Sequence, residues 1–341
     1  MPLRDHQLAE TASWFELAFP HLGTQTRAAF AKACEWASMD GKYLVYPGHP
    51  HYPVLLAAID SPPKLLFVQG QIAALHVPLL GVVGSRRASP QGLQIARQFT
   101  EELALLGLGI VSGLALGIDA AAHAGALKSL TPLATVAVIG TGINETYPKQ
   151  NGKLRDAILE RGCVVSEFPL GTPALAQHFP RRNRVIAGLS SGVWVVEAAM
   201  KSGSLITARQ ALDYGRDVFA TPGSIFSSQS KGCHWLIKQG AKLVEEVGDI
   251  LLEINQTSLS VTSATSTTCE ISQSALKEAA MWGQSNDVQC ELLERVGWGP
   301  WWPESLASEL GVTQPYLLQL LLEWELSGHI SHNAEGQVLR V

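Results

Sequence analysis

The chain has 341 residues, of which 46% are hydrophobic and 16% charged, and its formal net charge is −5. This composition excludes a disordered chain and is typical of a well-packed protein with two or three domains. Five widely spaced cysteines without a CxxC pair exclude the usual zinc frameworks and favour a reducing compartment. Apolar runs fall short of the roughly 18 residues that span a bilayer, so we expect a cytoplasmic protein without a signal peptide or membrane contact.

The first 75 residues are expected to form a small helical domain of the SAM or helix-hairpin-helix kind. Apolar residues recur at helical spacing over 10–34, with a break at 19–24 that contains Pro20 and Gly23. Because the turn lacks a second glycine, a structural role is favoured over a DNA-reading one. A proline-rich connector follows over 46–63, and the short apolar run at 65–68 predicts an edge strand.

Residues 76–254 alternate between short apolar runs and amphipathic segments, a pattern that predicts a doubly wound, mostly parallel α/β sheet. Ser89 and Pro90 supply the N-cap and first-turn proline of the first helix, which Gly107 ends. The strands are expected at 79–83, 109–112, 135–139, 163–166, 193–197 and 217–220. The helices are expected at 89–106, at 119–127, at 154–161, from about 182, and at 204–214.

Glycine, serine and arginine follow these strands, at the edge where such sheets bind ligands. Glycine lets backbone N–H groups approach an anion, and each following helix presents its positive end. We therefore expect a rim of phosphate-binding groups along this edge. The alternative is that the glycines are there only because tight turns need them. The residues of this rim before the third expected helix are Gly84, Ser85, Arg86, Arg87, Ser112, Gly113, Gly140 and Gly142.

The stretch over 166–223 adds positive charge to this acidic chain, because it holds six lysines and arginines. One interpretation is that the localised positive potential of this stretch attracts phosphates. The plainer alternative is that these residues form a solvated basic face. Arginine forks grip phosphates bidentately, so we expect the arginines of this stretch to join Arg86 along one border of the sheet. Phe168, Phe179 and Tyr147 could stack on unpaired bases or belong to the core. The predicted site residues here are Phe179, Arg181, Arg182, Asn183, Arg184, Lys201, Ser202, Gly203, Ser204 and Thr207.

Motifs for other chemistries are missing from the sequence. There is no GxGxxG after the first strand, no GxxxxGK[ST] and no HExxH, so we expect neither a dinucleotide cofactor nor a metal. The GxSxG match at 188–192 follows a helix and precedes a strand, which is the reverse of a nucleophile elbow. Asp119 and His123 lie four apart and could form an acid/base pair; the favoured alternative is a helix cap and a packed histidine.

Seven ordered motifs then resemble the bacterial DNA-processing protein A family, also called Smf. They read GVVGSR, SGLALGIDAAAH, GTGINETYPKQN, SEFPLG, HFPRRNRVIAGLS, VVEAAMKSGSLITA and FATPGS, and they lie between residues 81 and 224. The resemblance covers about 46–244.

This resemblance implies an extended Rossmann domain that binds single-stranded DNA, forms a homodimer, and loads a RecA-type recombinase during natural transformation, without catalysis. A single-strand-binding protein is a further implied partner. The family pattern assigns phosphate contacts to Gly84, Ser85 and Arg86, and to the segments 182–184 and 202–207. Some members carry a lysine in the loop that is 173–177 here, where this chain has no cation. The partner and dimer region is implied only as a segment, 232–241, which includes Gly232, Trp235, Leu236 and Gln239.

The C-terminal part is expected to be a linker over 255–280 and a winged-helix-like domain over 281–341. Residues 255–275 hold 11 serines and threonines, a flexible-linker composition. Three helices at 287–296, 303–310 and 314–327, followed by a hairpin at 329–341, resemble the winged helix of some family members. Residues 282–341 carry eight acids against two arginines, which favours protein contact or autoinhibition over duplex recognition.

Two function classes therefore stay open. The first is a mediator that holds single-stranded DNA without reacting with it. The second is a hydrolase of nucleoside monophosphates, which shares the Rossmann shape and would need Glu197 or Asp119 poised as an acid/base in the pocket. A purely structural scaffold is a third possibility.

Overall fold

A computed structural model describes residues 11–15, 23–262, 330–332 and 338–340, with side chains over 11–15 and 23–254. The chain divides into two compact units, Met1–Ala264 and Thr265–Val341. In the described ranges no helix has both the length and the apolar character that a membrane crossing requires.

One nine-stranded sheet organises the first unit, in the order β1-β2-β6-β5-β4-β3-β7-β8-β9. The pairs from β6 through β9 are parallel, whereas β1, β2 and β6 pair antiparallel, so the sheet is mixed and mostly parallel. Its strands are β1 Lys42–Val45, β2 Leu66–Gly70, β3 Leu79–Val83, β4 Gly109–Ser112, β5 Thr135–Val138, β6 Gly162–Ser166, β7 Gly192–Val195, β8 Asp217–Ala220 and β9 Lys242–Leu243. The predicted parallel α/β architecture is confirmed.

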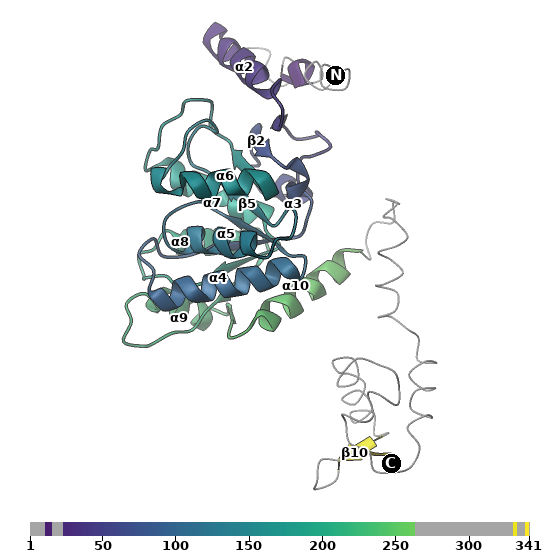
Figure 1. Cartoon of the computed structure of the whole chain (residues 1–341), viewed down its shortest axis with the longest axis vertical. Helices are drawn as coiled ribbons and strands as arrows, with labels where there is room; N and C mark the ends of the chain where they lie inside the picture. Colours follow the sequence, from purple (N-terminus) through teal and green to yellow (C-terminus); the bar gives the residue numbers. More distant parts are fainter. Residues whose placement is uncertain (1–10, 16–22, 263–329, 333–337, 341) are drawn as a thin grey trace. The chain divides into compact units, whose positions relative to one another are not determined.

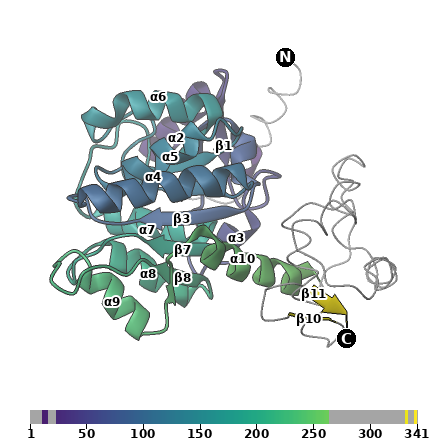
Figure 2. The same cartoon turned by 60° about the horizontal axis from the view of Figure 1, so that its bottom comes forward.

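Helices cover both faces of this sheet (Figures 1 and 2). Helices α4, α5 and α6 lie on one face, and α7 and α8 lie on the other. The helices are α2 Thr24–Ala37, α3 Val54–Ala57, α4 Pro90–Leu105, α5 Ile118–Lys128, α6 Gly152–Arg161, α7 His178–Leu189, α8 Ser204–Asp213, α9 Lys231–Lys238 and α10 Val247–Thr262, with 3-10 turns η1 Ile72–Leu75 and η2 Lys149–Asn151. Helix α4 begins as predicted, because the Ser89 hydroxyl accepts from the Gly92 N–H at 3.0 Å.

Separate apolar clusters hold the two layers to the sheet. Successive strand residues point to opposite faces, so Val83 packs with the α7 and α8 side while Val82 packs with the α4 and α5 side. A third cluster joins α2 and α6 to β1 and β2 through Trp36, Phe67 and Ile158. The central strands β3, β4, β5 and β7 are buried along their whole length, as their mostly apolar sequences predict.

The N-terminal side of the sheet differs from the prediction. The strand expected at the edge is β2, but it pairs on one side with β6 and on the other with β1, which the sequence did not predict. The sheet therefore begins at Lys42, whereas the α/β domain was expected to begin at residue 76. Residues 11–15 are helical and α2 starts at Thr24, while the turn between the two expected helices lies largely outside the described residues.

The C-terminal predictions are covered only in part. Helix α10 continues to Thr262, past Ile254, so the expected linker begins within a helix. In the second unit, β10 Ile330–His332 pairs antiparallel with β11 Val338–Arg340, which agrees with the predicted hairpin strands. The three helices expected between 287 and 327 lie outside the described residues.

Candidate functional site

An open pocket of about 510 Å³ lies at the carboxyl ends of β3 and β7. The chain order of the strands reverses there, because β4 lies on one side of β3 and β7 lies on the other. Such a switch point is where doubly wound sheets bind ligands. Its lining comes from the loops after β3, β4 and β7, from the first turns of α7 and α8, and from Gln229.

The loop after β3 supplies two of the predicted cations. A Cβ on Gly84 would lie 2.5 Å from the Ile118 side chain, so glycine lets this loop pass close to α5. Its amides are used within the protein: the Ser85 N–H donates to the Glu197 carbonyl at 2.8 Å, and the Arg87 N–H donates to the Ser85 hydroxyl at 3.1 Å. Arg86 and Arg87 both line the pocket, and both residues are exposed.

Helix α7 presents one face to the pocket. It begins at His178, four residues earlier than predicted. Phe179, Arg182 and Asn183 fall on one side at helical spacing and all line the pocket. Arg181 and Arg184 fall on the opposite side, where they line a different cavity of about 400 Å³.

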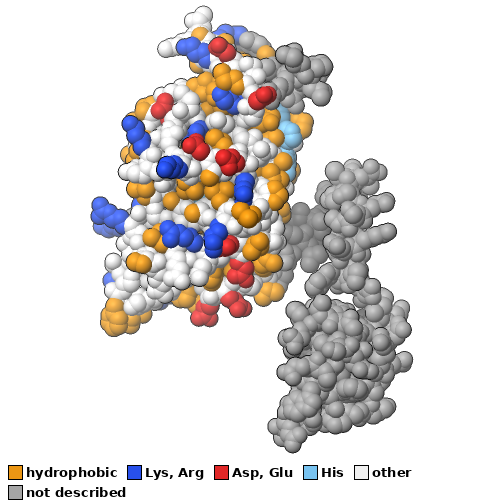
Figure 3. Space-filling model, viewed as in Figure 1, with side chains coloured by type: hydrophobic (Ala, Val, Ile, Leu, Met, Phe, Trp, Pro, Cys, Tyr) orange, Lys and Arg blue, Asp and Glu red, His pale blue; other side chains and the backbone are white. Residues whose placement is uncertain are grey.

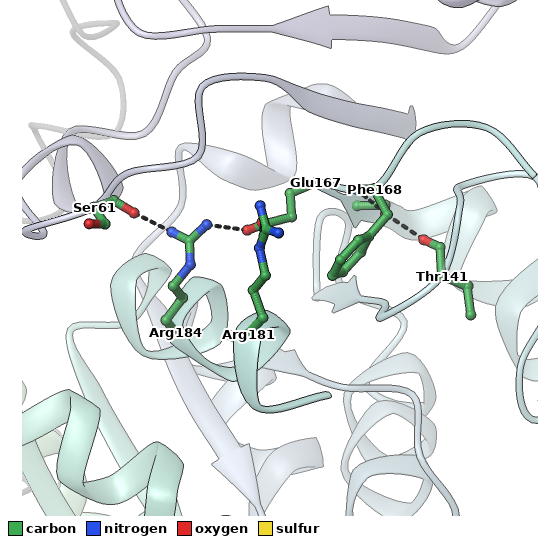
Figure 4. Close-up of polar contacts among 7 residues, drawn as sticks. Ser61, Thr141, Glu167, Phe168, Arg181 and Arg184 are labelled. Atoms are coloured by element: carbon green, nitrogen blue, oxygen red, sulfur yellow. Dashed lines mark hydrogen bonds and ion pairs between the residues drawn. The ribbon is translucent and has the colours of Figure 1, made fainter. Parts of the chain in front are cut away.

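The prediction that all these arginines share one border is therefore wrong for Arg181 and Arg184. Both guanidinium groups turn toward the carboxylate of Glu167, as Figure 4 shows. Arg181 Nε lies 2.5 Å from Glu167 Oε1, and Arg184 pairs with Oε2 while also donating to the Ser61 carbonyl. The side chain of Glu167 is only 4% exposed, so the two arginines neutralise a buried carboxylate. They are not free to bind a phosphate in the pocket.

Arg182 forms the floor of the pocket. It is 4% exposed, its Nη1 donates to the Val138 carbonyl at 2.6 Å, and its guanidinium lies against Gly113. Burial lowers the pKa of Arg182 to about 10, with the charge of Asp119 opposing the shift, so the group stays cationic at neutral pH. Asp119, in the first turn of α5, also lines the pocket; burial raises its pKa, and the charges of Arg182 and Arg86 oppose that rise.

Aromatic rings stand beside the cationic rim. The Arg86 guanidinium carbon lies 5.0 Å from the centre of the Phe179 ring, within cation–π range. Phe179 lies 5.7 Å from Tyr147, which is 45% exposed, and a small cavity of about 60 Å³ opens between these rings and Gly113. Phe168 is buried, so of the two readings left open for it, membership of the core is confirmed.

The start of α8 completes the rim across from Arg86. Lys201 and Gly203 are exposed there, and Ser202 accepts from the Ser204 N–H at 3.2 Å. Thr207, one turn further, is buried and lines the pocket. The positive end of this helix therefore points into the pocket beside the lysine.

Other predicted site residues have structural roles. The buried Ser112 hydroxyl donates to the Val82 carbonyl at 2.6 Å, which ties β4 to β3. A Cβ on Gly142 would lie 2.6 Å from the Pro169 carbonyl, so this glycine permits close loop packing away from the pocket. Gly113 and Gly140 line the small cavity beside Phe179.

Of the residues considered for catalysis, Asp119 lines the pocket and the others are held by other groups. The Glu197 carboxylate, which does not line the pocket, accepts from the N–H and hydroxyl of Ser89 and so caps α4. His123 is buried and bonds to the Thr135 hydroxyl at 2.7 Å rather than to Asp119, which confirms that it is a packed histidine. The other half of that alternative is wrong, because the N-cap of α5 is Gly117 and no side chain caps the helix. Ser190 of the GxSxG match is buried and donates to the Ile186 carbonyl. Among the described side chains, no three histidines, cysteines or acids gather to hold a metal.

The expected partner segment falls on α9. Gly232 and Leu236 are buried within the chain, and a Cβ on Gly232 would lie 2.5 Å from the Ala198 carbonyl. Trp235 is 43% exposed and Gln239 is also exposed.

The charged side chains that line the pocket are mostly positive. Its charged lining consists of four cations and one carboxylate, although the whole chain carries −5. On the face covered by α4, α5 and α6, basic and acidic side chains are intermingled (Figure 3). Sequence reasoning missed Gln229 and considered Asp119 in the pocket only as a possible acid/base; the clues were their places after the exits of β8 and β4, where this sheet gathers its ligand groups.

Comparison with known proteins identifies relatives of this chain. The family model described as DNA recombination-mediator protein A matches residues 43–255. Protein Smf of Escherichia coli is 48% identical over 236 residues, which cover 69% of this chain. That alignment spans 61% of the E. coli protein, less than two thirds of its length.

Solved structures agree. The X-ray structure of DNA processing protein A from Streptococcus pneumoniae has a TM-score of 0.61 and 40% identity, covering 73% of this chain and 92% of that one. A Helicobacter pylori structure, described as giving insight into a single-stranded DNA binding mode of DNA processing protein A, has a TM-score of 0.56 and 28% identity, covering 63% and 95%.

Proposed function

The chain belongs to the DNA recombination-mediator protein A family, and from this membership we propose that it binds single-stranded DNA in the pocket at the exits of β3 and β7. The observation that carries the proposal is the Arg86 guanidinium, exposed at the pocket rim and 5.0 Å from the Phe179 ring. The cation contacts a phosphate while the neighbouring rings stack on an unpaired base, a combination suited to single strands.

The proposed role of the protein is to deliver the bound strand to another protein. We infer that the protein loads a RecA-type recombinase onto it during natural transformation, as a homodimer that uses the exposed Trp235 and Gln239 of α9. A single-strand-binding protein is a further partner in this proposal. The name of the S. pneumoniae relative, DNA processing protein A, supports a role in DNA processing.

Binding proceeds without chemistry in this proposal. The support is that Glu197 is occupied in capping α4, and that His123 bonds to Thr135 beneath the surface. A nucleoside-monophosphate hydrolase would release free base from its substrate. We expect no free base when the protein is incubated with nucleoside monophosphates, and steady turnover lost in Glu197→Gln would overturn this part.

The binding test compares labelled single- and double-stranded oligonucleotides at two salt concentrations. Arg86→Ala should weaken single-strand binding by about 1–3 kcal/mol at low salt and flatten the salt dependence, because one phosphate contact is lost. Arg209→Ala is the matched control, since Arg209 is exposed on α8 but does not line the pocket. Equal affinity of wild type and Arg86→Ala would refute the site.

A further inference from the structure

The cationic pocket contains a carboxylate that phosphate binding does not explain. Asp119 lines the pocket and is only 6% exposed. It accepts a long hydrogen bond of 3.4 Å from the Ala115 N–H, and the Gly113 N–H also lies close to it. A carboxylate has about four acceptor positions, so several stay open. A negative group repels phosphate and therefore suits a ligand that donates hydrogen bonds.

Two more residues of the pocket lining carry buried polar groups. Within the described part of the chain, Arg182 Nε and Thr207 Oγ1 have no hydrogen-bond partner, although both residues line the pocket and are at least nine-tenths buried. Buried polar groups are almost always paired, so unpaired ones in a pocket point to a missing ligand. The floor thus offers an acceptor at Asp119, a donor at Arg182 and a hydroxyl that can do either.

A nucleobase is the part of a DNA strand that matches such a floor. The pairing edge of guanine presents the O6 acceptor next to the N1–H and N2–H₂ donors. The pairing edges of adenine, cytosine and thymine each carry a single donor nitrogen, so guanine alone offers two adjacent donors to a carboxylate. Proteins that hold an extruded base read it through this edge.

We propose that the pocket takes up one unpaired guanine of the bound strand, with the Asp119 carboxylate accepting from N1–H and N2–H₂ and Arg182 donating to O6. This inference rests on the proposed single-strand binding. The rim cations hold the flanking phosphates, and the pocket of about 510 Å³ leaves room for a nucleotide. The protein then prefers strands that contain guanine instead of binding all sequences alike.

A plainer role for Asp119 makes the opposite prediction. As a counter-ion for Arg182 and Arg86 alone, its removal would change the affinity for every strand by the same factor. A base reader changes affinity for one base only. The discriminating experiment therefore varies the base as well as the protein.

The probe is a short labelled oligothymidylate with one central dG, dI, dA or dC, titrated against the full chain by fluorescence anisotropy. The dG strand should bind about tenfold tighter than the all-thymidine strand, within the range expected for one bidentate base contact. The dI strand, whose base lacks the 2-amino group, should fall between them. Asp119→Asn should remove the dG advantage, measured within that variant as the ratio of its affinities for the dG and all-thymidine strands, and Asp213→Asn, an exposed change on α8, should keep that ratio.

Each outcome decides the question. Equal binding of all wild-type strands, or a uniform change across bases in Asp119→Asn, overturns the guanine site while leaving single-strand binding intact. Failure of wild type to bind even the all-thymidine strand removes the proposed function itself. Should Asp119→Asn not fold, the wild-type comparison of dG with dI still decides, because it removes one donor from the ligand and nothing from the protein.

Discussion

Replacing Gly113 by alanine should destabilise the protein by displacing the Arg182 guanidinium. A Cβ at this position would lie 1.8 Å from Arg182 Nη1 and 2.3 Å from Cζ, far inside van der Waals contact. Small backbone adjustments cannot absorb such an overlap. The guanidinium must leave, and with it goes the hydrogen bond from Nη1 to the Val138 carbonyl.

The cost follows from that hydrogen bond. A charged hydrogen bond contributes about 1.5–3 kcal/mol, and a buried carbonyl left unpaired costs about 1–3 kcal/mol more. We therefore expect Gly113→Ala to lower the free energy of unfolding by roughly 3–5 kcal/mol, a large share of the usual 5–15 kcal/mol of a folded domain. Urea titration followed by circular dichroism measures the change.

A matched control and a second background sharpen the test. Gly203 lines the same pocket in a right-handed helical conformation, and a Cβ there would meet nothing within 4 Å, so Gly203→Ala should leave stability within about 1 kcal/mol of wild type. In an Arg182→Ala background, Gly113→Ala should cost little, because the clashing group is gone. The reasoning fails if Gly113→Ala matches wild type, or costs as much without Arg182 as with it.

Three further variants or conditions test other contacts. Burial lowers the pKa of His123 to about 3, below its usual 6.5, so only the unfolded chain takes up a proton there as the pH falls below 6.5. The free energy of unfolding should therefore decrease by roughly 3–5 kcal/mol between pH 6.5 and pH 3. His123→Gln should flatten this pH dependence in urea titrations. Ser89→Ala should cost about 1–2 kcal/mol in thermal unfolding, since α4 loses its N-cap. Arg184→Ala should lower stability by about 1–3 kcal/mol, because Glu167 loses a partner, yet leave oligonucleotide affinity unchanged. Arg86→Ala should lower the affinity and leave stability unchanged. Equal affinity losses in the two variants would contradict the placement of Arg184 on the face of α7 that points away from the pocket.

The central sheet could be predicted because its strands are buried on both faces. The run at Leu79–Val83 is apolar throughout, and a short apolar run before a capped helix has few other readings. Strand β1 could not be predicted in the same way. Its four residues begin with Lys42 and are buried only in the second half, so neither alternation nor a continuous apolar run marks it, and its pairing with β2 depends on distant contacts.

The residue types of the site could be predicted from the sequence, but the directions in which the side chains of α7 point could not. The residue types at the strand exits indicated an anion pocket, and Arg86 and Lys201 lie where they were expected. The phase of α7 was missed because Pro180 obscures the helix start, although a proline in the first turn breaks no helical hydrogen bond. These arginines were expected at the start of a helix and along one border, but within α7 successive side chains diverge by about 100° per residue, so Arg181 and Arg184 lie opposite Arg182.

The strand order has a consequence for biosynthesis. Val83 of β3 pairs with Val195 of β7, so the two walls of the pocket come from segments that leave the ribosome far apart in time. A nascent chain that ends after β6 holds the glycine-arginine turn but has nothing opposite to it. Because a ligand stabilises only the species that binds it, a ligand of this pocket would stabilise the chain only after β7 has joined the sheet.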